Sequence, residues 1–100
     1  MSNDTIAKTI IAQMGGFSRL GVMVGAYNFT AHENGVSFRI KVRGAKANYA
    51  KITLNSMDTY DLEFVKIHGT KVKPVAKVAG IYNDQLIAMC EKHTGLAFRL

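Results

Sequence analysis

The stretch at positions 36–43, VSFRIKVR, alternates apolar and polar side chains without a break. Alternation with a period of two is typical of a half-buried β-strand, because successive side chains of a strand point to opposite faces. The apolar members are Val36, Phe38, Ile40 and Val42, and the polar members are Ser37, Arg39, Lys41 and Arg43. The segment therefore predicts a strand of an antiparallel sheet with one face against a core and the other in solvent.

Four further segments predict the neighbouring strands. Residues 20–29, 49–55, 59–68 and 71–78 alternate or are rich in β-branched and aromatic side chains, and turn-forming residues separate them. Asn34-Gly35 predicts the hairpin turn before the strand at 36. Phe64-Val65 interrupts the alternation and predicts a bulge or burial on both sides, and Pro74 predicts that its strand lies at an edge.

Helical spacing appears at both ends of the chain. One apolar stripe near the N-terminus consists of Ile6, Ile10, Ile11 and Met14, and Gly15-Gly16 ends it. A second stripe near the C-terminus consists of Tyr82, Leu86, Met89, Cys90 and His93. The predicted class is α+β, with an antiparallel meander of about five strands and an N-terminal and a C-terminal helix packed on one face.

Length and composition limit the remaining choices. One hundred residues, 1–100, predict a single domain. The lone Cys90 excludes an internal disulfide and a cysteine-based zinc site, as expected in a reducing compartment. The N-terminal segment has no long apolar run, and no segment reaches the about 20 apolar residues of a membrane span, so we expect a cytoplasmic protein that does not enter a membrane.

The charge pattern suggests one binding surface. The net charge is +6, and a basic balance favours anionic partners. If the strands at 37–43 and 49–55 are neighbours, their outward side chains form one basic face. The candidate nucleic-acid-binding residues are Arg39, Lys41, Arg43, Lys46, Tyr49 and Lys51. Cations beside an aromatic ring are typical of single-strand binding, but basic residues on an exposed strand also keep it soluble, and both interpretations stay open.

Other residue groups have structural interpretations. The second basic series, Lys66, Lys71, Lys73 and Lys77, is interpreted as protection of an edge strand. Asp61 and Glu63 are explained by cross-strand pairing with lysines, and Cys90 by burial beside His93 on the apolar stripe. Because no acid, base and nucleophile converge in the sequence, we predict a protein that is not an enzyme, with no catalytic residues, no metal and no cofactor.

Six short motifs together resemble a known group of proteins. They are GG (15–16), GAYNF (25–29), NGVSFR (34–39), KITLNSMDTYDLEF (51–64), IYNDQL (81–86) and TGL (94–96). This set resembles small uncharacterised proteins of tailed bacteriophages, a family of unknown function, over roughly residues 14–100. The resemblance implies a phage-encoded protein that works in the cytoplasm of the host cell, and it carries no functional residue over.

Two functional hypotheses follow. The first is a non-enzymatic accessory protein that binds nucleic acid through the basic sheet face. The alternative is a protein-interaction module that inhibits or redirects a host enzyme or defence complex, as in host takeover. Three consecutive apolar residues, Val22, Met23 and Val24, are interpreted as part of a strand. If both faces of that strand are apolar, a second copy of the chain would cover the outer face, which suggests a homo-oligomer.

Overall fold

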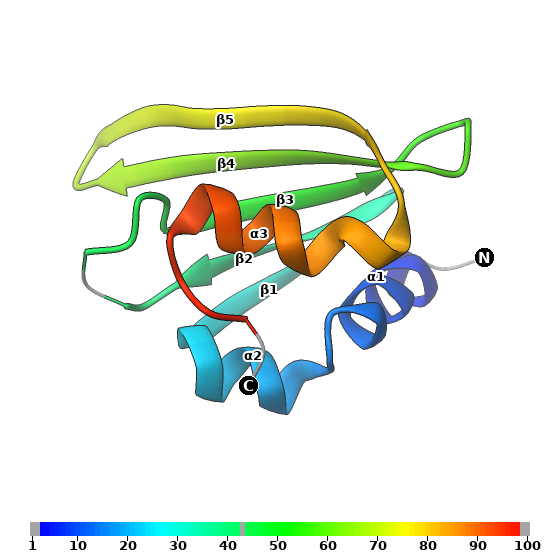
Figure 1. Cartoon of the computed structure of the whole chain (residues 1–100), viewed down its shortest axis with the longest axis horizontal. Helices are drawn as coiled ribbons and strands as arrows, with labels where there is room; N and C mark the ends of the chain where they lie inside the picture. Colours follow the sequence, from blue (N-terminus) through cyan, green and yellow to red (C-terminus); the bar gives the residue numbers. More distant parts are fainter. Residues whose placement is uncertain (1–2, 43, 99–100) are drawn as a thin grey trace.

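The computed structural model describes residues 3–42 and 44–98. Five strands form one antiparallel sheet in the order of the chain (Figure 1). They are β1 (Ala26–His32), β2 (Gly35–Ile40), β3 (Tyr49–Leu54), β4 (Tyr60–His68) and β5 (Lys71–Ile81). The predicted meander is confirmed, and so are the edge position of the strand that contains Pro74 and the irregular pairing at Phe64 and Val65.

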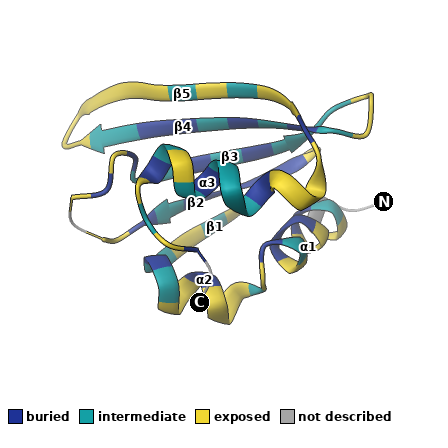
Figure 2. Ribbon diagram, viewed as in Figure 1, coloured by how far each residue is buried: buried dark blue, intermediate teal, exposed yellow. Residues whose placement is uncertain are grey.

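Every described helix packs on the same face of this sheet. The helices are α1 (Asn3–Gln13), α2 (Phe17–Val24) and α3 (Leu86–Thr94), with the short 3-10 turn η1 (Asn83–Gln85) before α3. Ile10 of α1, Leu20 of α2 and Leu86 of α3 are fully buried in one core with the inward side chains of the strands (Figures 1 and 2). The α+β class with helices on one face is therefore confirmed.

The strand predicted at residues 20–29 is wrong in its first half. Residues 20–24 belong to α2, and β1 begins only at Ala26. Leu20 and Val24 lie one helical turn apart and are both buried, while Val22 between them is 84% exposed. Gly25 ends the helix in the left-handed conformation (φ 63°), and its N–H donates to the Gly21 carbonyl at 3.1 Å. The apolar run VMV therefore belongs to a helix in which only Val24 of the three is fully buried, while Val22 faces outward. The homo-oligomer that was predicted through a strand at these residues is not supported, because no strand forms there.

The predicted turn at Asn34-Gly35 is displaced by one residue. Glu33 and Asn34 form the two-residue turn, and Gly35 already pairs with His32 as the first residue of β2. Gly35 also lies opposite Thr53 of β3, where a Cβ atom would overlap the Ile52 carbonyl oxygen. The glycine is therefore needed for the close approach of two strands and not for the turn.

Candidate nucleic-acid interface

The sheet face opposite the helices is free of any described helix. Two cross-strand rows of paired residues occupy most of it, because antiparallel pairing places directly opposite side chains on the same face. The first row, from β1 to β5, is Tyr27, Arg39, Tyr49, Val65 and Pro74. The second row is Thr30, Ser37, Lys51, Glu63 and Lys77. We call this surface the open face.

The first row brings two tyrosines to either side of an arginine. Tyr27 is 39% exposed, and Arg39 and Tyr49 are half-buried. Lys41, just beyond the end of β2, places its Nζ 5.6 Å from the centroid of the Tyr27 ring, within the range of a cation–π contact. The row thus presents two aromatic rings and two cations to a ligand.

Arg39 has one polar atom that the fold leaves unsatisfied. Its Nε is shielded from solvent and has no hydrogen-bond partner among the described residues. A buried donor without a partner is costly, and native structures keep few of them.

The second row contains both positively and negatively charged side chains. Lys51 and Lys77 lie on either side of Glu63, and all three line a shallow depression of about 200 Å³ together with Thr53 and Asp61. The Asp61 carboxylate accepts hydrogen bonds from the Asn55 side chain at 3.1 Å and from the Gly80 backbone at 3.4 Å. The acids are thus held within the sheet, and they reduce the positive charge of this half of the open face.

The structure brings four of the predicted binding residues together. Arg39, Tyr49 and Lys51 share the open face, and Lys41 joins them through Tyr27. Lys46 instead lies on the helix side, where its aliphatic carbons pass 3.6–3.7 Å from the Cβ position of Gly95. Arg43 lies outside the described residues.

Tyr27 and Lys77 were not predicted as part of this site. A bulge in β1 between Tyr27 and Thr30, with Asn28 in the left-handed conformation (φ 57°), sets Tyr27 opposite Arg39. The sequence signal was the aromatic–Asn pair in GAYNF, because asparagine tolerates a left-handed backbone better than most residues. Lys77 reaches the open face by pairing with Glu63.

Cys90 is confirmed as a buried structural thiol. Its side chain is fully buried, and burial together with the nearby Glu91 carboxylate raises the pKa of the thiol to about 12. A thiol with so high a pKa stays protonated near neutral pH and is a poor nucleophile. The neighbouring His93 is half-buried, and its ring contacts that of Phe64 with the ring centroids 5.3 Å apart.

Residues 3–42 and 44–98 contain no group of three His, Cys, Asp or Glu side chains that could hold a metal ion. Within the same ranges no helix has the length and apolar character to cross a membrane. No known family model, curated protein or solved structure matches the chain.

Proposed function

We propose that this protein is a non-enzymatic accessory protein that binds single-stranded nucleic acid on the open face. The observation that carries the proposal is the row Tyr27–Arg39–Tyr49 across three adjacent strands. Its phage origin and its place of action in the host cytoplasm are proposals that rest on the motif resemblance alone.

The spacing of the row suits bases and phosphates together. Neighbouring strands lie about 4.8 Å apart, so the two tyrosines are roughly 10 Å apart with the guanidinium between them. Aromatic side chains on open sheets bind single strands by stacking on the bases, and arginine adds cation–π contacts and phosphate hydrogen bonds.

Removing either ring should weaken binding measurably. We expect Tyr27→Ala and Tyr49→Ala each to reduce the affinity for a labelled single-stranded oligonucleotide about fivefold, and the double variant about thirtyfold, because stacking contributes about 1 kcal/mol or more per base. Fluorescence anisotropy at fixed salt measures the affinities.

The matched control keeps the rings and removes only the hydroxyls. Tyr27→Phe/Tyr49→Phe should bind as the parent does, because stacking needs the π-face and not the hydroxyl. If the alanine double variant binds as well as the phenylalanine variant, the tyrosines do not stack on bases. If the parent binds no oligonucleotide at low salt, the proposed function is wrong.

A second candidate function is protein interaction, and the outer surface of α2 favours it. Val22 is 84% exposed and Phe17 is 50% exposed, and a hollow of about 280 Å³ beside Val22 is lined by Ser18, Arg19 and Met23. Exposed apolar groups of this kind are typical of contact surfaces. This candidate predicts that tagged parent protein, but not Val22→Asp, recovers one stoichiometric host protein after nuclease treatment. Recovery of nothing by the parent would exclude it.

A further inference from the structure

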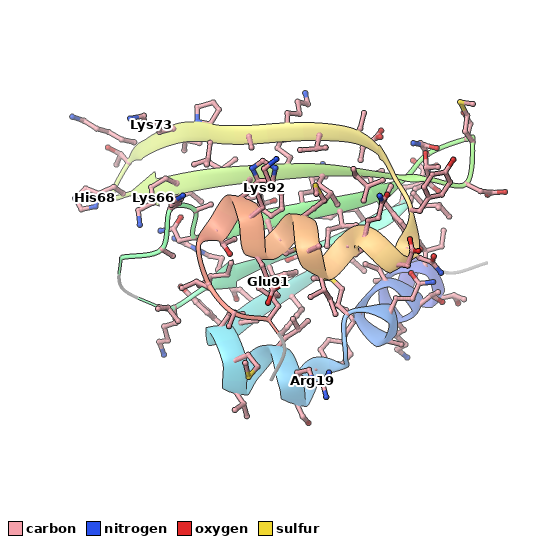
Figure 3. All side chains as sticks on the ribbon, viewed as in Figure 1. Arg19, Lys66, His68, Lys73, Glu91 and Lys92 are labelled. Atoms are coloured by element: carbon pink, nitrogen blue, oxygen red, sulfur yellow. The ribbon has the colours of Figure 1, made fainter. Side chains whose placement is uncertain are left out.

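A second basic surface forms on the helix side of the sheet, where the β4–β5 hairpin extends beyond the end of α3 (Figure 3). Lys66 of β4 pairs directly with Lys73 of β5, and His68 pairs with Lys71. Phe64, two residues before Lys66, is buried beneath α3 and contacts His93. Because strand side chains alternate, Lys66 and His68 point to the same side as Phe64, and their partners on β5 share it.

Two other elements add lysines to this surface. Lys92 comes from the last turn of α3, and Lys46 comes from the loop between β2 and β3. The Lys46 backbone N–H donates to the Thr94 carbonyl at 2.9 Å, which holds the loop against the end of α3. The Lys66 ammonium donates to the Ala45 carbonyl at 2.7 Å, which links the hairpin to the same loop. We call Lys46, Lys66, Lys71, Lys73 and Lys92 the helix-side lysine cluster.

The described acids lie away from this cluster. Asp61 and Glu63 belong to the open face, Glu33 and Asp58 to the turns at the other end of the sheet, and Asp84 to the start of the C-terminal helical segment. Glu91 lies on the opposite side of α3 from Lys92 in Figure 3, and its carboxylate accepts a hydrogen bond from the Phe98 N–H at 3.0 Å. The cluster is therefore a surface of concentrated positive charge.

The fold explains this concentration only in part, since Lys66 holds the loop through the Ala45 carbonyl and Lys92 lies in the last turn of α3, where a cation complements the helix dipole. Like charges directly opposite each other on neighbouring strands are destabilising, and Lys66 with Lys73 is such a pair. Edge protection accounts for the lysines of β5, but not for Lys66 on the interior strand β4 or for Lys46 and Lys92 on other elements. Burial, Lys92 and Lys46 together lower the pKa of His93, because burial and nearby positive charges both disfavour the protonated imidazole.

We infer that the helix-side lysine cluster binds a ligand with several adjacent phosphate groups. Lysine ammoniums are compact point charges with three donors each, which suit the many oxygens of a phosphate chain. A loop, two strands and a helix present these charges near one helix end, so a chain of phosphates can contact several of them at once. The source of the phosphates is a nucleic-acid backbone or a free polyphosphate, and the inference does not rest on the function proposed for the open face.

The test compares two phosphate ligands that carry no bases. Titration calorimetry at low salt measures the binding of inorganic tripolyphosphate and of an abasic deoxyribose-phosphate oligomer. We expect the parent to bind tripolyphosphate and Lys71→Gln/Lys73→Gln to bind it about tenfold more weakly, because two exposed charge contacts are lost. The control Lys8→Gln/Arg19→Gln removes the same net charge from α1 and α2 and should bind as the parent does. Bound phosphate should also raise the His93 pKa, which NMR of the imidazole follows.

The outcomes distinguish the two sources of phosphate, and they distinguish this inference from the function proposed for the open face. Binding of the abasic oligomer at the cluster identifies a nucleic-acid backbone, whereas binding of tripolyphosphate alone identifies a free polyphosphate. Tyr27→Ala/Tyr49→Ala should keep its tripolyphosphate affinity, so a failure of the open-face proposal leaves this one standing. If the parent binds neither ligand, or if the cluster variant and its control lose affinity equally, the inference is wrong.

Discussion

Gly35→Ala is expected to lower the free energy of unfolding by about 3 kcal/mol, at the upper end of the cost of overpacking a tight site. The added Cβ would overlap the Ile52 carbonyl oxygen and lie 2.9 Å from the Thr53 Cα atom. Both are backbone atoms of β3, so no side-chain rotation relieves the contact. Strands β2 and β3 must therefore move apart. The cross-strand pairs Arg39–Tyr49 and Ser37–Lys51 of the open face would be disrupted with them.

Thermal or urea unfolding followed by circular dichroism measures this change. For a domain of this size the melting temperature should fall by roughly 4–8 °C for each kcal/mol. Gly21→Ala is the matched control, because Gly21 lies inside α2 with no atom within 4 Å of its Cβ position. That change should stabilise the protein by about 0.5–1 kcal/mol through helix propensity. Equal effects at the two glycines would contradict the steric explanation for Gly35.

Binding of single strands to the open face should weaken about fiftyfold between about 50 and 200 mM salt. This magnitude follows from four phosphate contacts, each contributing about −0.7 to the slope of log affinity against log salt for a single strand. The four cations are Arg39, Lys41, Lys51 and Lys77. Lys46 is not counted, because it lies on the helix side.

A variant in which two of these cations are replaced by neutral side chains tests the assignment of those contacts. Arg39→Gln/Lys51→Gln should reduce the salt slope by about 1.4, since two contacts are lost. Lys8→Gln/Arg19→Gln carries the same change of net charge on the helices, so its slope should match that of the parent. A slope that both variants lower equally would mean that total charge, and not the open face, attracts the strand.

The strand period predicted the sheet well because it is a local property. Val36, Phe38 and Ile40 are buried and Arg39 faces the opposite side, as the alternation indicated. Two members depart from the prediction: Val42 lies beyond the end of β2 and is 38% exposed, and Ser37 is buried with its hydroxyl oxygen 2.7 Å from the His32 Nε2 atom. The same reasoning failed for residues 20–24, since a short apolar run fits a helix with one buried face as well as a strand. Only the contacts of Leu20 and Val24 with the core distinguish the two.

The candidate site was likewise predicted where strand alternation applies and missed where it does not. The alternation at residues 37–43 and 49–55 predicted that Arg39, Tyr49 and Lys51 share a face, which the pairing of β2 with β3 shows. The position of Tyr27 depends on a bulge in β1, and that of Lys46 depends on where the loop of residues 41–48 meets α3. Neither can be derived from periodicity, because bulges and loops have no period.

The sequence by itself determined the strand order of a meander, the inward or outward direction of most side chains in β2 to β4, the edge position of β5 and the burial of Cys90. Each depends on neighbouring residues or on apolar content. The tertiary structure alone decided that Tyr27 lies beside Arg39 and that lysines of the β2–β3 loop, the β4–β5 hairpin and α3 lie on one side of the sheet near the end of α3. These arrangements join residues far apart in the chain, and register, bulges and loop docking set their distances. Those features follow from the packing of the whole core.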